Sequence, residues 1–527
     1  MLQFVGDSHR NFRTSSYGVF AQDSFKLRHN LTLNYGLRYE LNTVLREAHG
    51  RLSTWRPQDF TTYLPLAPTV QTDLAVLRAS GVVTQGEVGG IYDPDHNNLA
   101  PRIGLAWDTF GNGKTVVRTG YGVFYETIIG NIPGNVMLNP PFLPDYFTPF
   151  PFTAALWPNV FGPSPFPVLT ITQQRLRTPY AQHYNLEIQH ELPGRILLEI
   201  GYVGTSGTKL PRFRQIDQAF ITQKQLNQLT PDLSTRLSLM GLPPGAVQSL
   251  VSGMPATIPF IPSVARTPYF GYAQLFQAEN VVSSNYNSWQ AKLDKRFSHG
   301  LSFLTSYTWS HSIDGASVFF GSGANATTIF PQDNYNLRAE RGNSDFDIRH
   351  RLSWSLICEL PAMHQLPKLL GQGWQVGGIL TLQTGQPFSV LTGKGLSGTG
   401  LGNDRPDLVG DPNAGPHTVQ KWFNTSAFVD NQPLTFGDAG RNIVVGPGYR
   451  DFDFSILKNM KLGESVNLQF RTEFFNITNH PSFALPSNIR AAANFGALFT
   501  TPDAAQNNVG LGSGGPRLVQ FALKLSF

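Results

Sequence analysis

The feature that most constrains this 527-residue chain is a repeated alternation of apolar and polar residues with a period of two. Between residues 31 and 41, leucine or tyrosine fills every odd position, opposite Thr32, Asn34, Gly36, Arg38 and Glu40. Because side chains of a β-strand point alternately to its two faces, this pattern predicts a strand with one apolar and one polar face. Runs of this kind predict thirteen strands, at residues 15–25, 29–41, 101–108, 115–126, 180–191, 195–204, 286–297, 301–310, 349–360, 373–384, 452–460, 465–476 and 518–527.

The connections between these strands alternate in length without exception. The short ones have 3 to 12 residues and lie at 26–28, 109–114, 192–194, 298–300, 361–372 and 461–464. The long ones have 38 to 81 residues and lie at 42–100, 127–179, 205–285, 311–348, 385–451 and 477–517. Strands that meander up and down place every second connection at the same end of a sheet. Short turns at one end and long loops at the other are typical of outer-membrane barrels and uncommon in soluble sandwiches.

The chemistry of the two strand faces agrees with a barrel in a membrane. We expect lipid to contact the apolar face and water in a lumen to contact the polar face, which carries Arg38, Glu187, Lys292, Asp294, Arg471 and Glu473. Aromatic residues suited to the headgroup region gather toward the long-loop ends: Tyr39, Tyr125, Tyr180, Tyr202, Tyr307 and Trp309. We therefore predict an all-β fold, an antiparallel transmembrane β-barrel of the outer-membrane type with long extracellular loops.

Composition removes several other classes of protein. Charged residues make up only 14% of the chain and aromatic residues 12%, which argues against disorder, coiled coil and an ordinary helical enzyme. No apolar run approaches the roughly 18 residues of a membrane-spanning helix. The net charge of +5 is small for this length and does not indicate nucleic acid as a partner. The single cysteine, Cys358, allows neither an internal disulfide nor a Cys/His zinc pattern.

The first residues suggest that part of the barrel lies elsewhere. Met1–Arg10 has neither the basic region nor the apolar core of a secretory signal, so either the protein stays in the cytoplasm or its beginning is missing. Barrels of bacteria normally have an even number of strands, and thirteen is odd. We expect an odd number of strands upstream, with residues 1–14 as a loop remnant of that region and 15–527 as the C-terminal portion of a barrel incomplete at its N-terminus.

Several segments resemble TonB-dependent outer-membrane receptors. Gln22–Glu40 (QDSFKLRHNLTLNYGLRYE) is similar to a hairpin of that family. Lys295–Asp314 (KRFSHGLSFLTSYTWSHSID), Arg341–Leu352 (RGNSDFDIRHRL) and Leu468–Phe483 (LQFRTEFFNITNHPSF) resemble its Oar-like barrel branch. With Pro101–Tyr125 and the last strand, the resemblance runs through nearly the whole chain.

The resemblance implies a 22-stranded barrel in the outer membrane, an N-terminal plug and a periplasmic TonB box, often after a carboxypeptidase-regulatory-like domain. The chain departs from the family there, since it carries no plug, TonB box or leading domain, and TonB becomes a partner only if these are supplied upstream. The last strand is similar to the signal that the barrel-assembly machinery reads, with Val519, Phe521, Leu523, Leu525 and Phe527 as its residues.

Two motifs suggest cofactors but fit loops better. Gly393, Gly395 and Gly398 form a GxGxxG pattern that opens no helix in a βαβ unit, so we interpret it as a loop and not a nucleotide site. Asp93, Asp95 and Asn97 resemble the start of a calcium loop, but that loop's glycine and final glutamate are missing. A surface calcium site remains an alternative to the favoured polar loop. We predict no catalytic residues, no cofactor and no metal.

The remaining charged motifs are interpreted as structural. His350 begins a strand and is expected at the rim or in the lumen, beside Arg349 and Arg351, which could line that lumen or lie on a solvated face. The carboxylate pairs Asp345/Asp347 and Asp451/Asp453 are two apart on strand-like segments, hence on one face, and nothing completes an acid–base site.

Two features of the loops are also predicted. The proline-rich segment Pro133–Pro167 forms a stiff aromatic loop that either contacts a ligand, such as a carbohydrate or peptide, or caps the barrel. Stretches near 71–79 and 218–240 are expected to form short helices.

We carry three functions forward. The first is the barrel of a TonB-dependent transporter that takes up a siderophore, oligosaccharide or peptide in its complete form. The second is a structural or adhesive outer-membrane protein without active transport, or a non-functional fragment. The third, a soluble carbohydrate enzyme, is weak because no convincing pair of catalytic acids is present.

Overall fold

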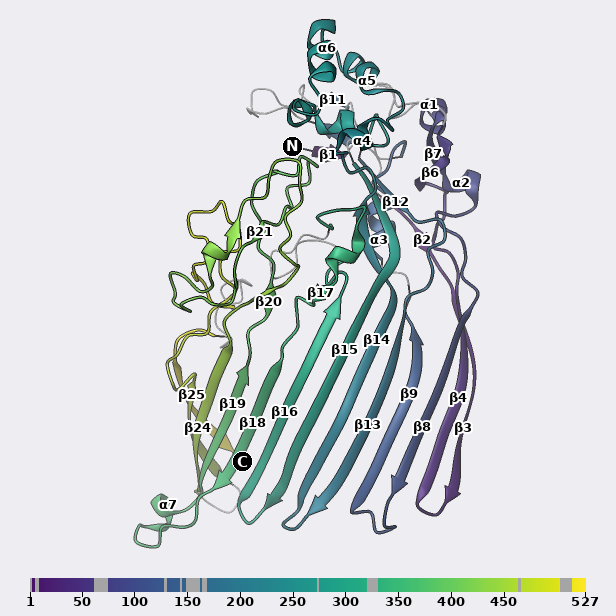
Figure 1. The fold of residues 1–527 in the computed structure, drawn as a ribbon. Helices are drawn as coiled ribbons and strands as arrows, with labels where there is room; N and C mark the ends of the chain where they lie inside the picture. The colour runs from purple at the N-terminus through teal and green to yellow at the C-terminus, as the bar shows by residue number, and fades with distance from the viewer. Residues whose placement is uncertain are drawn as a thin grey trace.

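The computed structural model describes residues 2–4, 9–60, 74–127, 130–142, 145–147, 162–163, 168–272, 274–319, 330–462, 466–502 and 514–527. Their dominant feature is one large antiparallel sheet whose path runs β3-β4-β8-β9-β13-β14-β15-β16-β18-β19-β24-β25-β26. Figure 1 shows these strands side by side and tilted, with short turns at one end and long loops at the other. The bounds are β3 Ser16–Arg28, β4 Leu31–Asn42, β8 Asn98–Asp108, β9 Thr115–Tyr125, β13 Tyr180–Leu192, β14 Ile196–Gln215, β15 Gln274–Ser298, β16 Leu301–Asp314, β18 His350–Glu359, β19 Trp374–Gln383, β24 Tyr449–Lys461, β25 Asn467–Phe475 and β26 Leu518–Ser526.

The thirteen predicted strands and the alternation of short and long connections are confirmed. Tight turns arise where the sequence supplies residues that tolerate positive φ. Between β15 and β16, His299 and Gly300 have φ values of 53° and 73°, as a two-residue turn with the twist of the flanking strands requires. Two strands exceed their predicted length by about ten residues, because β14 continues to Gln215 and β15 begins at Gln274. This long hairpin rises above the neighbouring strands into the loop region (Figure 1).

The sheet has two free edges within the described part of the chain. β3 pairs only with β4, and β26 pairs only with β25. Both edge strands run from the long-loop end to the short-turn end, because β3 leads into the short turn before β4 and β26 follows a long connection. The edges therefore cannot complete an antiparallel ladder by pairing directly with each other.

The long loops fold into a packed layer at one end of the sheet. Four buried apolar clusters hold it together, and they contain Trp55, Leu52, Leu237 and Phe423 respectively.

The predicted helices near 71–79 and 218–240 are confirmed by α1, α4 and α5. The smaller elements are β1 Leu2–Phe4, β2 Phe12–Arg13, β5 Arg46–Glu47, β6 Ser53–Phe60, α1 Leu74–Ala79, β7 Ser80–Thr84, α2 Gln85–Val88, α3 Asn131–Val136, β10 Asp145–Phe147, β11 Gly162–Pro163, β12 Val168–Thr172, α4 Gln223–Leu226, α5 Leu233–Leu239, α6 Pro244–Ser252, β17 Gly342–Asn343, α7 Lys368–Gly371, β20 Pro387–Phe388, β21 Asp407–Leu408, β22 Phe428–Val429 and β23 Val444–Val445, with 3₁₀ turns at Ile258–Phe260, Ser263–Arg266, Leu337–Glu340 and Thr425–Ala427.

Two further points complete the comparison with the sequence. Most of the proline-rich segment, including 148–161 and 164–167, lies outside the described residues. None of the helices in the described ranges is long and apolar enough to cross a bilayer.

Candidate functional site

The strand register separates the sheet into a polar face and an apolar face. Directly paired residues share a face, and following the pairs from strand to strand places all six predicted lumen residues together. The charged residues of the polar face include Arg38, Arg102, Arg118, Glu187, Glu199, Lys292, Asp294, Arg351, Asp451, Asp453, Arg471 and Glu473. The register therefore confirms the prediction that these residues share one polar face.

A ladder of polar contacts crosses four strands of the polar face. An Arg118 guanidinium nitrogen on β9 donates to the Gln189 amide oxygen on β13. Gln189 Nε2 donates to Glu199 Oε1 on β14 at 3.0 Å, and Lys292 Nζ on β15 lies 3.1 Å from Glu199 Oε2. Cations and carboxylates alternate across the ladder, so the surface is strongly polar but nearly neutral.

The apolar face carries the predicted aromatic residues at the long-loop end. Tyr125 and Tyr180 rings lie 5.5 Å apart, and Trp289 and Tyr307 rings 6.1 Å apart. Tyr307 Oη lies 2.8 Å from His350 Nδ1, because His350 pairs with Trp309 and shares its face. His350 is thus at the rim, as predicted, but the alternative placement in the lumen is wrong.

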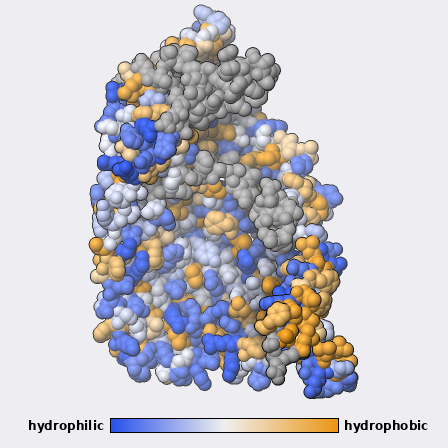
Figure 2. Space-filling view, turned by 180° about the vertical axis from the view of Figure 1, so that it is seen from behind, coloured by the Kyte–Doolittle hydropathy of each residue, from blue (hydrophilic) through white to orange (hydrophobic). Residues whose placement is uncertain are grey.

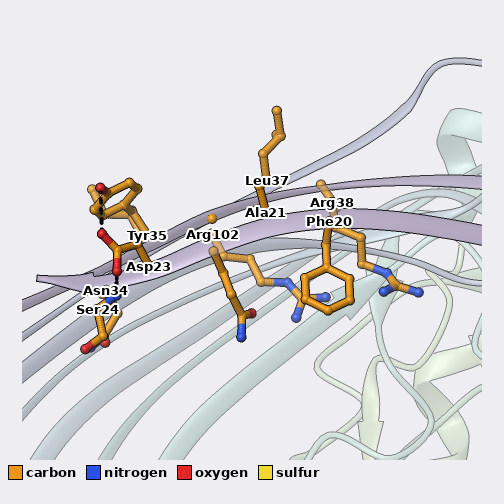
Figure 3. A pocket seen from close by; sticks show the side chains of 14 residues that line it. Phe20, Ala21, Asp23, Ser24, Asn34, Tyr35, Leu37, Arg38 and Arg102 are labelled. Atoms are coloured by element: carbon orange, nitrogen blue, oxygen red, sulfur yellow. Dashed lines mark hydrogen bonds between the residues drawn. The ribbon is translucent and has the colours of Figure 1, made fainter.

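One hollow lies along the free edge at β3, between β3, β4 and β8. It has a volume of about 610 Å³, and its walls come from both faces of the sheet. Figure 3 shows Arg38 and Arg102 on one side of the strands and Leu37 on the other, with Tyr35 Oη donating to Asp23 at 3.2 Å. A binding pocket would open on one face only. We interpret this hollow as the space beside an unpaired strand.

A second cavity, of about 370 Å³, opens among the long loops and is called the outer cleft here. It is lined by Thr54, Trp55, Arg56, Pro57, Gln58, Ile91, Ile171, Thr172, Gln174, Arg214, Ile216, Tyr269, Gln277 and Tyr335. Trp55 and Tyr269 meet edge to face with ring centroids 4.7 Å apart. Trp55 Nε1 donates to Ser80 O at 2.8 Å, which fixes the indole in this wall. The cleft thus combines aromatic surface with exposed side-chain amides.

Two charged groups beside the outer cleft, Arg214 and Asp217, are neutralised by their surroundings. Arg214 Nε and Nη2 each lie 2.9 Å from a carboxylate oxygen of buried Glu279. Tyr269 N donates to Asp217 at 2.7 Å, and burial raises the pKa of the Asp217 carboxyl well above its usual range. Burial also raises the pKa values of Tyr269 and Tyr335, so both phenols stay protonated. The cleft can therefore offer neutral donors and acceptors to a ligand.

Buried ion pairs join the long loops that form the packed layer at one end of the sheet, which is called the loop roof here. Arg405 Nη1 lies 3.0 Å from both carboxylate oxygens of Glu340, and Arg441 pairs with Asp314. Asp345 lies 3.6 Å from Arg441 and accepts from Asn442 Nδ2 at 2.7 Å. The structural role predicted for Asp345 agrees with these contacts. Its placement on a strand is wrong, because residues 344–349 form a loop beyond β17.

Other carboxylates and their neighbours also make structural contacts. Asp347 accepts from Ser312 N at 2.7 Å and from Arg349 Nε at 2.8 Å. Arg351 faces the lumen side, since it pairs with Thr308. Asp451 and Asp453 share the polar face of β24, as predicted.

The two motifs that suggested cofactors make structural contacts within the loops. Gly393 and Gly398 lie in a loop with φ values of 70° and 71°. Gly398 O accepts from Arg266 Nη2 at 2.6 Å, which ties this loop to a neighbouring one. Asp95 pairs with Arg177 at 2.8 Å and accepts from Thr178 N at 2.8 Å. Among the residues whose positions are described, no cluster of three His, Cys, Asp or Glu side chains could hold a metal ion.

Nothing in the sequence pointed to the outer cleft. Trp55 and Tyr335 come from two different connections, Arg214 from the upper end of β14 and Tyr269 from the connection after it, and they meet only in the folded loops. Four of the predicted terminal signal residues, Val519, Phe521, Leu523 and Leu525, share the apolar face of β26, where Phe521 stacks on Phe470 with centroids 6.3 Å apart, and Phe527 follows the end of the strand.

Comparison with known proteins gives one extensive match. A family model described as "Outer membrane beta barrel domain" matches residues 2–520. No curated protein matches the chain.

Solved structures with a similar arrangement are distant in sequence. The ferripyoverdine receptor of the outer membrane of Pseudomonas aeruginosa is 10% identical, with 98% of this chain and 39% of that chain covered and a TM-score of 0.43. The outer membrane transporter YddB from Escherichia coli is 10% identical, with 97% and 45% covered and a TM-score of 0.49. The ferric-catecholate import receptor Fiu from E. coli K12 is 9% identical, with 98% and 45% covered and a TM-score of 0.42. The chain spans less than half the length of each of these three proteins.

Proposed function

Because the chain belongs to the outer membrane β-barrel domain family, we propose that it is the barrel of a TonB-dependent transporter that imports a ligand from outside the cell. In an outer-membrane barrel the apolar face contacts lipid and the polar face lines the lumen. The observation that carries the proposal is the combination of a polar, nearly neutral strand face with a cleft among the long loops. A polar lumen is common to outer-membrane barrels, so the cleft is the feature that favours ligand binding over a structural role.

The outer cleft favours a ligand rich in hydroxyl or amide groups. Gln58 and Gln174 present exposed amides, and half-buried Tyr269 presents aromatic surface against the buried Trp55 ring. The guanidinium of Arg214 is already neutralised by Glu279. An oligosaccharide or peptide finds suitable partners here, whereas a multiply charged ligand does not find a concentration of one charge.

The two free edges support closure by further strands. β3 and β26 run in the same direction, so an antiparallel meander between them requires an odd number of additional strands. We propose that these strands, with a plug and a TonB box, belong to a region upstream of residue 15. A second copy of the sheet would place β3 beside β26 in parallel, which does not fit the antiparallel ladder. The barrel-assembly machinery would insert the complete barrel through the signal that ends at Phe527.

Uptake assays on cells that produce the complete protein test this proposal. The probes are two fluorescent pools, one of short oligosaccharides and one of tripeptides to pentapeptides, given to cells with and without TonB. We expect TonB-dependent accumulation of one pool. Binding that remains at the surface and does not depend on TonB would identify an adhesive protein, and no retention of either pool would also overturn the proposal.

Matched variants locate the binding site. Gln58→Ala with Gln174→Ala changes two exposed amides of the outer cleft, and Gln248→Ala changes an exposed amide on α6, outside the cleft. We expect roughly a tenfold loss of accumulation for the double variant, as for losing two ligand hydrogen bonds, and wild-type accumulation for Gln248→Ala. Equal behaviour of the two would exclude the cleft as the binding site.

A further inference from the structure

One connection at the short-turn end is longer and more apolar than the other described turns. It joins β18 to β19 through residues 360–373, whereas the turns at 29–30, 193–195 and 299–300 are very short. Its sequence, LPAMHQLPKLLGQG, holds no acidic residue and two groups that can be cationic, His364 and Lys368. Five large apolar side chains are exposed on it: Leu360 (40%), Met363 (43%), Leu366 (47%), Leu369 (52%) and Leu370 (54%).

The connection has an ordered backbone. Met363 N donates to Gly371 O at 2.9 Å, and Leu370 N and Gly371 N both donate to Pro367 O at 2.8 Å. A side chain at position 371 would bring its Cβ within 2.4 Å of the Met363 carbonyl oxygen, so this close approach requires glycine. Leu369 and Leu370 lie in the single helical turn α7, and Leu366 lies just before it, next to Pro367. The exposed leucines thus form a defined surface.

The connection folds back onto the apolar face of the sheet. Trp374 and Lys458 are directly paired and belong to that face. Trp374 Nε1 donates to Leu370 O at 2.7 Å, while Lys458 Nζ donates to Leu370 O at 3.2 Å and to Gln372 O. The ammonium also lies 5.0 Å from the Trp374 ring centroid, and Lys458 is only 4% exposed. A lysine on the lipid side is thereby covered by the turn.

The position of the turn in the molecule agrees with these contacts. Figure 1 shows α7 projecting sideways from the foot of the sheet and not beneath it. In the opposite view, Figure 2 shows apolar surface that continues from the lower strands to the protruding corner, where hydrophilic surface appears at the tip. The apolar patch is thus continuous with the face that contacts lipid.

We propose that residues 360–373 form a membrane anchor, inserted at the boundary between the acyl chains and headgroups of the periplasmic leaflet. Short turns of outer-membrane barrels lie on the periplasmic side. Leu366, Leu369 and Leu370 enter the acyl region, and His364 and Lys368 contact phosphate groups, as in interfacial helices with an apolar face and cationic flanks. The partner is lipid, and the inference does not depend on transport.

Depth-dependent quenching tests the anchor in the complete protein reconstituted in phosphatidylethanolamine–phosphatidylglycerol vesicles. Cys358→Ser removes the single native thiol, and Leu369→Cys then carries an environment-sensitive fluorophore. Nitroxide groups near the top of the lipid acyl chains act as quenchers. The matched control is Asn112→Cys, which labels another turn at the same end of the sheet. Heat-modifiable electrophoretic mobility selects folded samples, and Met363→Cys gives a second reading.

We expect at least roughly threefold stronger quenching at positions 369 and 363 than at 112, with blue-shifted emission, because only the anchor residues enter the acyl boundary. Replacing Leu366 and Leu370 by glutamine should abolish the difference. Equal, weak quenching at 369 and 112 would overturn the proposal. The label at position 369 could also prove to be shielded from water in native membranes but not in these vesicles, which hold no other protein. That result would overturn the proposal and indicate a periplasmic protein partner.

Discussion

Glu47, in the first long loop, links the folding of that loop to pH. Its side chain is 1% exposed and accepts hydrogen bonds from three backbone amides: Asn11 N at 3.2 Å, and His49 N and Arg51 N at 2.9 Å each. Burial alone would raise its pKa, but these amides and the Arg51 charge outweigh burial and hold the pKa at about 2. Glu47 therefore stays ionised inside the folded loop.

The depressed pKa gives the sign and size of the effect. The ordinary value is 4.5, so the difference of about 2.5 units corresponds to about 3 kcal/mol of stabilisation that is present above pH 4.5. It is lost as the pH falls toward 2, because the unfolded loop takes up the proton first. The opening constant of the loop should then rise roughly a hundredfold.

Pepsin is active over this pH range and cuts opened loops, so cleavage within 43–97 from pH 5 to pH 2 measures the effect. Glu47→Gln places an amide donor against backbone donors, and we expect a loop that is already open at pH 5 and whose cleavage depends little on pH. Asp59→Asn, an exposed change in the same loop, should keep the wild-type profile. Wild-type cleavage that stays flat down to pH 2, after correction for pepsin activity on an unfolded peptide, would refute the reasoning.

Three further predictions concern the barrel and its roof. Ile200→Arg on the apolar face should lower the free energy of unfolding in vesicles by about 2–4 kcal/mol. Ser306→Arg on the polar face should lower it by far less, and equal losses would contradict the assignment of faces. Deleting Phe527 should reduce the heat-modifiable, folded form several-fold while Phe527→Trp preserves it, and unchanged yields would remove Phe527 from the assembly signal. Arg405→Met should destabilise the loop roof by about 3–5 kcal/mol, because it leaves Glu340 buried without its cation. Adding Glu340→Gln should restore most of the lost stability. Hydrogen exchange across 385–448 measures this, and a double variant as unstable as the single one would count against the ion pair.

The strands were predictable because each one meets two different solvents. Lipid on one face and water on the other impose a period of two on every strand, as in residues 31–41, and this signal needs no knowledge of neighbouring strands. The shared faces of Glu187 and Lys292 follow from the same local pattern. Where no lipid is present, as in the loop roof, the pattern disappears and the sequence no longer shows which side chains are buried.

The outer cleft was unpredictable because its residues meet through contacts distant in sequence. Trp55 and Tyr269 are separated by more than two hundred residues, and the partner of Arg214 is on another strand. The GxGxxG pattern is correctly interpreted as a loop, but the motif does not reveal that Arg266 donates to the Gly398 carbonyl oxygen. Spacing describes neighbours along the chain, and the cleft is built from neighbours in space.

The β14–β15 hairpin is longer than predicted because its alternation breaks partway along, and its upper end forms part of the outer cleft. Its register shifts twice, between Gly207 and Leu210 and between Leu210 and Pro211, and Lys209 has a φ of 56°, so the alternation breaks there. The two shifts cancel, and pairing continues in the original register to Gln215 opposite Phe276. Arg214 is therefore paired with Gln277 and both line the outer cleft, while Phe213 packs in the buried cluster around Leu52. The irregularity hides the extension of the hairpin from sequence analysis, and the pairing that resumes beyond it brings Arg214 and Gln277 to the cleft.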